Sequence, residues 1–240
     1  MNNYLDKFKG AYQDNFPYLL DNKLMLNWYP ERILKQATGQ SLLELGIGHG
    51  YSTVKFSERF NRHLVLEGSL AIINNFVKEF PECNAKILHS TFENFYTEEK
   101  FDIIIMGFIL EHVDDPSFIL TQYKHYLCPK GSIFIAVPNA EALNKRFGYE
   151  AGIINSMSDL SQNDIALGHK RLFTVKTLKD LVESQGYRAK ILEGIFLKPI
   201  TTQQIIDLKL SDNILKAMLK VGVDYPELCV GILMEIEVAE

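Results

Sequence analysis

Short apolar runs alternate with segments of helical period through the middle of the chain, from residue 41 to about 137. This alternation is typical of βαβ units, in which parallel strands are joined by crossover helices. The pattern predicts strands at 41–45, 63–66, 85–88, 102–107 and 132–137. It predicts helices between them at 51–60, 69–80 and 116–127. We therefore expect a doubly wound α/β fold.

The third of these helices has the clearest start signal. We expect Asp115 as its N-cap and Pro116 at its first position. Proline is tolerated there because the first N–H of a helix makes no intrahelical hydrogen bond. The connection before the fourth strand is different, because Phe92 to Lys100 is short for a full crossover helix. We expect one helix of the usual pattern to be reduced to a turn there.

A long mixed stretch, 139–173, follows the fifth strand. It exceeds the length of a simple connection, so we expect a lid or substrate loop over the sheet. A helix should then run from Val175 to Gln185, because Thr174 can cap its start and Gly186 can end it.

The end of the chain predicts two more strands, at 187–197 and 228–238. An amphipathic helical insertion, 199–227, separates them, and one face of it carries Ile214, Leu215, Met218 and Leu219. Residues 1–38 precede the first strand and are expected to form a helical cover. The prediction is one domain, 1–240, with a mostly parallel sheet of seven strands.

Composition excludes several function classes. The net charge is −5 and no basic stripe is present, which argues against nucleic acid as a substrate. The three cysteines lack the spacing of a metal site or a disulfide framework, as expected in a reducing cytoplasm. The N-terminus lacks signal-peptide character, and the longest apolar run, Ile103 to Leu110, is too short to span a bilayer. We expect a cytoplasmic protein without a membrane partner, as a monomer or homodimer.

A glycine-rich turn joins the first strand to the first helix, with Gly46, Gly48 and Gly50 in alternate positions. Glycines allow a tight turn and let a ligand approach backbone N–H groups, so a nucleotide or amino-acid ligand is indicated. A dinucleotide fingerprint would have a third glycine where Tyr51 stands. Glu67 follows at the end of the second strand, at the edge where such sheets bind ligands, and it could accept hydrogen bonds from vicinal ribose hydroxyls.

Four segments in succession resemble the motifs of class I methyltransferases, most closely the small-molecule branch of type 12 or ubiquinone-biosynthesis-like enzymes. They are Glu44 to Gly50, Glu67, Phe101 to Ile104, and Leu110 to Pro116. The resemblance covers roughly residues 38–190. It implies a Rossmann-like methyltransferase fold and S-adenosylmethionine as the methyl donor, with S-adenosylhomocysteine as product.

The resemblance also implies roles for individual residues. The turn from Gly46 to Gly50 would lie against the methionine part of the donor, with Glu44 in the same motif, and Glu67 would hold the ribose. Thr91 and Phe92 would meet the adenine, although the family often has Asp where Thr91 stands, so adenine recognition is expected to use backbone groups and packing. Glu111 and the histidine after it would shape the donor pocket.

Methyl transfer from a sulfonium needs alignment and, for a hydroxyl acceptor, removal of a proton. Two histidines are candidate bases: His169, before the helix that Thr174 caps, and His112, directly after the fourth strand. A solvated turn around His169 and a structural role for His112 are the alternatives. No metal is expected, because the acidic cluster from Glu111 to Asp115 offers no credible ligand set.

Acceptor binding is assigned to Arg171, Asn139 and Tyr149, in or beside the lid. Arg171 suits an anionic group, and Asn139 ends the fifth strand at the active edge. Two positions have a functional and a structural interpretation. His49 is expected on the loop surface rather than against the donor, and Trp28 is expected to anchor the core rather than line the pocket.

The function predicted is methyl transfer to a hydroxyl or amine of a small-molecule acceptor, without metal. A non-catalytic protein that binds S-adenosylmethionine and an NAD-dependent oxidoreductase are the alternatives. Tyr51 in the turn and the Glu111–His112 pair argue against the second.

Overall fold

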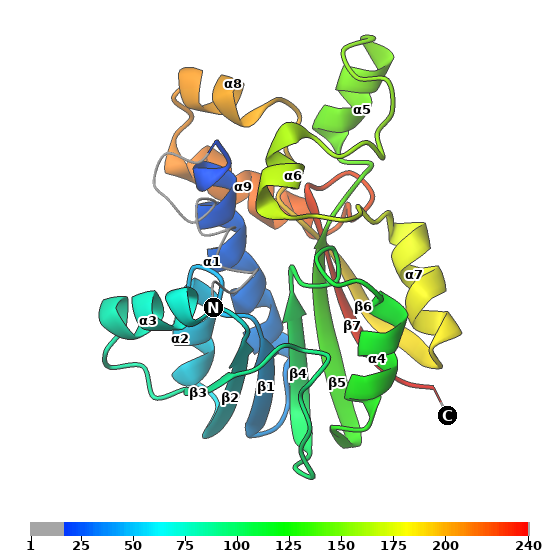
Figure 1. Ribbon diagram of the computed structural model, residues 1–240. Coiled ribbons are helices and arrows are strands. Elements are labelled where there is room, and N and C mark those ends of the chain that lie inside the picture. Colours follow the sequence, from blue (N-terminus) through cyan, green and yellow to red (C-terminus); the bar gives the residue numbers. More distant parts are fainter. Residues whose placement is uncertain (1–16, 240) are drawn as a thin grey trace.

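The computed structural model describes residues 17–239, which form a seven-stranded sheet in the order β3-β2-β1-β4-β5-β7-β6 (Figure 1). The strands are β1 (Ser41–Leu45), β2 (Arg62–Glu67), β3 (Lys86–His89), β4 (Phe101–Gly107), β5 (Leu127–Pro138), β6 (Tyr187–Ile195) and β7 (Gly231–Val238). β1 to β5 pair in parallel, and β7 is antiparallel to both β5 and β6. The mostly parallel, doubly wound fold is confirmed.

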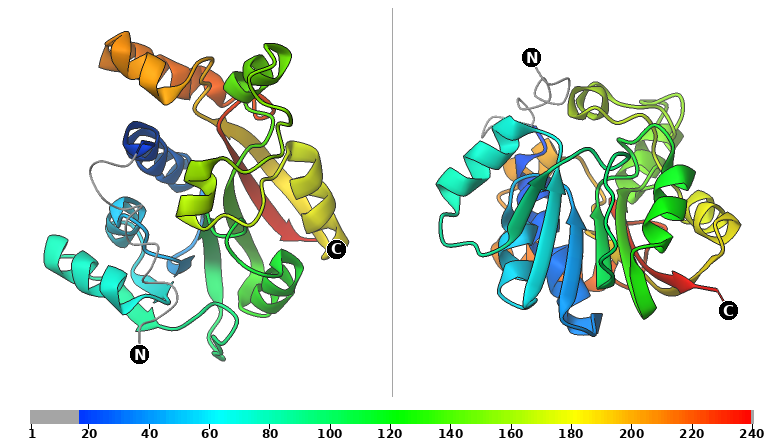
Figure 2. Two further views of the ribbon diagram at one scale, coloured as in Figure 1. Left: turned by 45° about the horizontal axis from the view of Figure 1, so that its top comes forward. Right: turned by 60° about the horizontal axis from the view of Figure 1, so that its bottom comes forward.

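Helices cover both faces of the sheet (Figure 2). On one face lie α1 (Leu19–Gln36), α2 (Tyr51–Ser57), α3 (Leu70–Glu79), α8 (Thr202–Asp207) and α9 (Asp212–Gly222). On the other lie α4 (Pro116–Lys124) and α7 (Val175–Ser184). Two further helices, α5 (Leu143–Glu150) and α6 (Gln162–Leu167), belong to the segment after β5.

The two faces explain why the central strands read as continuous apolar runs. In β4, Ile103 and Ile105 face the helices α1 and α2, whereas Ile104 and Met106 face α4 and α7, and all four are buried. A parallel strand covered on both faces gives no alternation of apolar and polar residues. Trp28 packs against the first of these cores, as expected.

Some boundaries differ from those predicted. β5 begins at Leu127 rather than at 132, because its first residues pair with the start of β4 across a shift in register between Phe101 and Ile103. The connection from β3 to β4 contains no helix in the described chain, in line with the short segment expected there. None of the helices that the structure describes is long and apolar enough to cross a membrane.

The segment expected as a lid lies beyond the carboxyl ends of β4 and β5, where α6 sits above the sheet and α5 projects further out (Figure 1). Ser161 caps α6 through a capping box with Asp164, and Gly168 ends it in the left-handed region. A hydrogen bond from Lys170 N to Glu111 O, 2.8 Å long, ties the end of this segment to the turn after β4. The lid residues therefore face the same edge as the glycine turn.

Candidate active site

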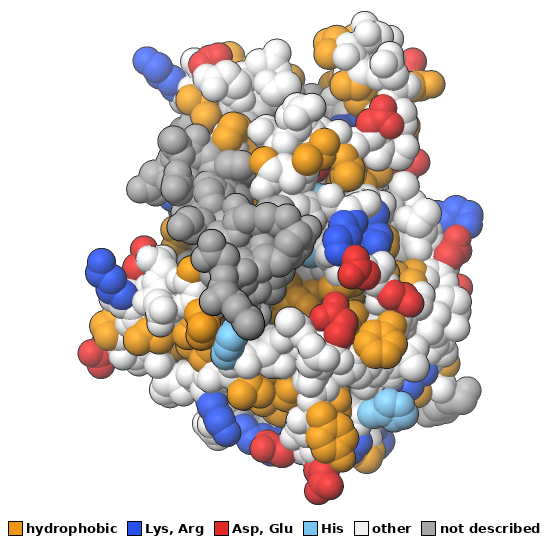
Figure 3. Space-filling view, in the orientation of Figure 1, with side chains coloured by type: hydrophobic (Ala, Val, Ile, Leu, Met, Phe, Trp, Pro, Cys, Tyr) orange, Lys and Arg blue, Asp and Glu red, His pale blue; other side chains and the backbone are white. Residues whose placement is uncertain are grey.

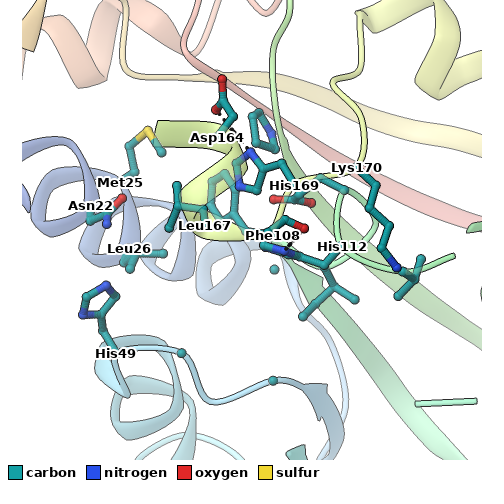
Figure 4. Close-up of a pocket in the computed structure, with 18 of the residues that line it drawn as sticks. Asn22, Met25, Leu26, His49, Phe108, His112, Asp164, Leu167, His169 and Lys170 are labelled. Carbon is teal, nitrogen blue, oxygen red and sulfur yellow. Dashed lines mark hydrogen bonds and ion pairs between the residues drawn. The ribbon is translucent and has the colours of Figure 1, made fainter. Parts of the chain in front are cut away.

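A cavity of about 660 Å³ opens at the carboxyl edge of the sheet. The glycine turn, the end of β2, the segment after β3 and the turn after β4 form one part of its wall, and α1 with the lid forms the other. Figure 4 shows Met25 and Leu26 of α1 across the cavity from His112 and His169. In a doubly wound sheet this edge is where ligands bind.

The glycine turn adopts a backbone that other residues rarely adopt. Gly46, Gly48 and Gly50 have φ of 80°, 54° and 80°. Space is restricted as well: a Cβ at Gly46 would lie 2.9 Å from Ile109 Cδ1, and one at Gly50 would lie 2.6 Å from Phe76 Cδ2. The turn therefore needs glycine for both its conformation and its packing, and all three residues line the cavity.

Glu67 organises the other side of this turn. Its Oε2 accepts a hydrogen bond of 3.1 Å from Ile47 N, and its Oε1 accepts one of 2.8 Å from Ser69 N. Burial raises the pKa of its carboxyl, while these backbone donors act in the opposite direction. Glu67 is 7% exposed and lines the cavity, so it combines a fixed orientation with lone pairs still available to a ligand.

The segment after β3 brings Thr91 and Phe92 to the same cavity, in line with the position that the resemblance implied for them, and Glu93 also lines it. Thr91 Oγ1 accepts a hydrogen bond of 2.8 Å from Asn94 Nδ2, so its side chain stabilises the turn. The expectation for His49 was a position on the loop surface; it is half-buried and lines the cavity opposite α6 (Figure 4).

Glu44 also corrects an expectation, because its carboxylate is not part of the described cavity lining. Its Oε1 accepts a hydrogen bond of 3.0 Å from Ser52, and its Oε2 lies 2.9 Å from His63 Nε2. Glu44 therefore links β1 to α2 and β2. Its side chain thus fixes α2 and β2 relative to β1, the strand that leads into the glycine turn.

Glu111 and His112 form the turn after β4, and both line the cavity. Glu111 is fully buried, and burial raises the pKa of its carboxyl to about 7. Burial and the neighbouring His169 lower the pKa of His112 to about 4, so this imidazole is neutral at physiological pH. Its Nδ1 lies 3.4 Å from Gly168 O.

The lid places His169 directly against this turn. The rings of His112 and His169 meet edge to face with centroids 4.9 Å apart. On its other side, His169 Nδ1 lies 3.2 Å from Asp164 Oδ1 (Figure 4). Hydrogen bonds and this histidine hold the pKa of Asp164 at about 2, so Asp164 is anionic. Sequence reasoning missed Asp164, although the Ser161 to Asp164 spacing of a capping box was visible.

Potential metal-ligand atoms of Glu111, His112 and His169 lie within 4.8 Å of one another. The residues from Glu111 to Asp115 alone give no indication of His169, which comes from the lid 57 positions along the chain from His112. A three-ligand set exists here geometrically, and the absence of metal dependence stays a prediction.

Arg171 has a structural role rather than the predicted one. Its Nη1 donates to Leu110 O and Val113 O, and its Nη2 donates to Asp114 O over 3.0 Å. The guanidinium thus braces the turn after β4 and is not among the described residues that line the cavity. The expectation of an anion-binding fork at Arg171 is corrected.

The other two residues predicted for acceptor binding differ in position. Asn139 is buried and lines the cavity, as expected, but its Nδ2 donates to three backbone carbonyls and its Oδ1 accepts from Glu141 N at 2.9 Å. Its amide therefore fixes the chain around Pro226 to Cys229. Tyr149 is 46% exposed on α5 and is outside the described cavity lining.

A buried polar cluster at the α1 side of the cavity was not foreseen. Lys198 Nζ donates to Asp21 Oδ2 and, over 2.9 Å, to Thr202 Oγ1. Both Lys198 and Asp21 line the cavity and are nearly inaccessible to solvent. The three residues lie up to 181 positions apart, so no local pattern signals the cluster.

Comparison with known proteins agrees with this geometry. A family model described as a methyltransferase domain matches residues 13–190, about three quarters of the chain. The chain belongs to this methyltransferase family. The resemblance to class I S-adenosylmethionine-dependent methyltransferases is thereby confirmed, including the donor type.

Two curated methyltransferases are similar over part of their length. The mitochondrial ubiquinone biosynthesis O-methyltransferase of Dictyostelium discoideum is 27% identical over 48% of this chain and 36% of its own. The (S)-coclaurine N-methyltransferase of Papaver somniferum is 26% identical over 52% and 37%. The match thus spans little more than a third of each relative.

A solved structure extends the similarity to the whole fold. The N-methyltransferase NodS of Bradyrhizobium japonicum, in complex with S-adenosyl-L-homocysteine, superposes with a TM-score of 0.62 and 12% identity. The similarity covers 100% of both chains. At this identity the comparison supports a shared fold and gives no information on the substrate.

Proposed function

We propose that this protein transfers a methyl group from S-adenosylmethionine to a hydroxyl or amine of a small-molecule acceptor held beneath the lid. One observation carries the proposal. A single cavity runs from the glycine turn and Glu67 to the two histidines His112 and His169. Candidate donor-side and acceptor-side residues thus line one cavity, as in-line transfer requires.

The residues present fit the donor. Glu67 offers lone pairs to the ribose hydroxyls, Gly46 and Gly48 leave room for the amino-acid part, and Phe92 offers a face for the adenine. When bound, S-adenosylmethionine supplies an electrophilic methyl group, which needs no protein nucleophile. The task left to the chain is to align the acceptor, exclude water and remove a proton.

His169 is the base that this geometry supports best. Asp164 is anionic and its Oδ1 lies 3.2 Å from Nδ1 of His169 without hydrogen-bond geometry. Its charge favours a proton on that nitrogen, which leaves Nε2 free to accept a proton. His112 is less suited, because the pKa of its ring is about 4. Its neutral ring packs against His169 and helps to hold it.

The acceptor is proposed to be small because it must share a cavity of about 660 Å³ with the donor, between α1 and the lid. The curated relatives methylate oxygen in one case and nitrogen in the other, by their names. Basic and acidic side chains are interspersed on the face seen in Figure 3, which supports a partner other than nucleic acid. We further propose a cytoplasmic protein that acts as a monomer or homodimer.

The experiment that tests this function is a transfer assay with S-adenosylmethionine carrying a labelled methyl group and a pool of metabolites. We expect label in a small-molecule product, formed by the wild type and not by Glu67→Ala at limiting donor. Donor binding without any labelled product would favour the non-catalytic alternative. Binding of NAD in place of S-adenosylmethionine would favour an oxidoreductase.

A further inference from the structure

The carboxylate of Glu111 is the most unusual group in the cavity. It is completely inaccessible to solvent, yet it borders the cavity beside His112 and His169. Neither Oε1 nor Oε2 has a hydrogen-bond partner among the residues that the structure describes. Buried carboxylates are costly unless they are paired, so this arrangement calls for a ligand that supplies the partner.

The neighbouring groups do not supply a counter-ion. His112 is neutral, since the pKa of its ring is about 4. Any positive charge on His169 is balanced by Asp164, whose Oδ1 lies 3.2 Å from its Nδ1. The guanidinium of Arg171 donates to three backbone carbonyls instead. His169 and Arg171 lower the pKa of Glu111 through their charge, but no described side chain forms an ion pair or a hydrogen bond with its carboxylate at the cavity wall.

The other unbonded side-chain oxygens on the wall are acceptors as well. Asp21 Oδ1 and Asn144 Oδ1 are buried, line the cavity and lack a donor within the described chain. The lysines on the wall are already engaged: Lys198 with Asp21 and Thr202, Lys170 with Asp114, and Lys145 with Met157 O at 3.3 Å. A ligand rich in hydrogen-bond donors would satisfy these unpaired acceptors.

We propose that the methyl acceptor is an amine that binds as its ammonium ion, with the carboxylate of Glu111 as its partner. An ammonium group brings both the positive charge and the N–H donors that this part of the wall lacks, whereas a hydroxyl brings only one donor and no charge. The apolar side chains of Met25 and Leu26 face this region and suit an apolar body on the amine. The proposal rests on the proposed function and names its substrate class.

The chemistry balances with groups already described. The bound ammonium gives one proton to His169, from which it passes to solvent, and this frees the nitrogen lone pair. The nitrogen forms a bond to the methyl carbon as the carbon–sulfur bond of the donor breaks. The electron pair of that bond stays on sulfur, leaving a neutral thioether and an N-methylammonium product. Glu111 remains ionised and holds the cation before and after transfer.

Calorimetry on protein saturated with S-adenosylhomocysteine tests the proposal without turnover. The probes are two amine and alcohol pairs of matched shape: benzylamine with benzyl alcohol, and phenethylamine with 2-phenylethanol, at about pH 8, where Glu111 is ionised. We expect each amine to bind at least about tenfold more tightly than its alcohol. In Glu111→Gln, which keeps the shape of the side chain, the preference should fall to within about threefold.

Asp114→Asn is the matched control, since it removes an exposed carboxylate from the same turn. It should keep the amine preference. Equal affinities in the wild type, or no binding of either class at about 50 mM, would overturn the proposal, as would loss of the preference in Asp114→Asn. Binding of Mg²⁺ or Zn²⁺ that excludes the amines would assign Glu111 to a metal instead and would also overturn it. Failure to bind S-adenosylhomocysteine would instead contradict the proposed function.

Discussion

Nδ1 of His169 and Oδ1 of Asp164 lie 3.2 Å apart, and both side chains are almost fully buried at the lid side of the cavity. The pair joins α6 to the segment that leads into α7. Because Asp164 is also the third residue of the capping box that starts α6, one carboxylate serves both the helix and the histidine. The position of the candidate base thus depends on the fold of the lid.

His169→Ala should lower kcat by about 10²–10⁴ and leave the affinity for S-adenosylhomocysteine nearly unchanged, because the base acts only on the acceptor. Asp164→Asn should lower kcat by a smaller factor through misorientation of the ring. Ser161→Ala is its control, because it removes the cap of α6 and keeps the carboxylate. Full activity of His169→Ala across a pH series would place the base elsewhere.

Arg171→Ala should destabilise the protein rather than weaken an anionic acceptor. Three hydrogen bonds from its guanidinium to backbone carbonyls would be lost, which we expect to cost about 2–4 kcal/mol of the free energy of unfolding. The adjacent Lys170→Ala removes only an ion pair with the fully exposed Asp114 and should cost much less. Urea denaturation measures both. Equal, small losses would show that the brace is unimportant.

The lowered pKa of His112 makes stability rise with pH between about 4 and 6.5. The contribution of Glu111 to stability, in contrast, should fall as the pH rises from about 4.5 to about 7, because burial raises its pKa from 4.5 to about 7. Within that window the folded state binds a proton that the unfolded state has lost. His169 and Arg171 act to lower this pKa and Asp164 acts to raise it. Above about pH 7 the contribution of Glu111 becomes constant.

Glu111→Gln should remove this dependence. The difference in unfolding free energy between the variant and the wild type should shift in favour of the variant by up to about 3 kcal/mol from pH 4 to pH 8. Denaturation at several pH values measures it. A difference that does not change with pH would mean that the pKa of Glu111 is not raised in the folded protein, because a partner outside the described residues offsets the effect of burial.

Activity should be independent of metal, because transfer from a sulfonium needs no Lewis acid. Methyl transfer should survive treatment with a chelator and show no gain from added Mg²⁺ or Zn²⁺. Glu111, His112 and His169 lie close enough together to hold a metal ion, so the prediction does not follow from a lack of ligands. Activity that a chelator abolishes and one divalent ion restores would contradict it.

The sequence predicted the sheet and the donor side well because their signals are local. β1 runs directly into the glycine turn, and Glu67 ends the neighbouring strand, so backbone topology alone brings them to one edge. The two short helices of the lid were not predicted from the sequence, because α5 contains no buried residue and α6 spans only 6 residues. Such helices are held by tertiary contacts and carry little apolar period.

The acceptor side could not be predicted in the same way, because it depends on where polar side chains turn. Arg171 reaches carbonyls about 60 positions away, and Asn139 donates to carbonyls about 90 positions away, so neither amide nor guanidinium is free. Glu44 lies in a strand whose five residues are all buried, and no alternation showed that it faces His63. The residue types indicated that these side chains are polar, but not which groups they contact.

The measurement that tests the central claim most directly is a calorimetric titration with S-adenosylhomocysteine and, separately, with NAD. The wild type should bind the first and not the second. Glu67→Ala should weaken binding by about 1–3 kcal/mol, the range for loss of a charged hydrogen-bond partner. Gly48→Val should abolish binding while the protein stays folded by circular dichroism, because Gly48 adopts a φ of 54° on the cavity wall. Unchanged affinity in a folded Gly48→Val protein would contradict the account.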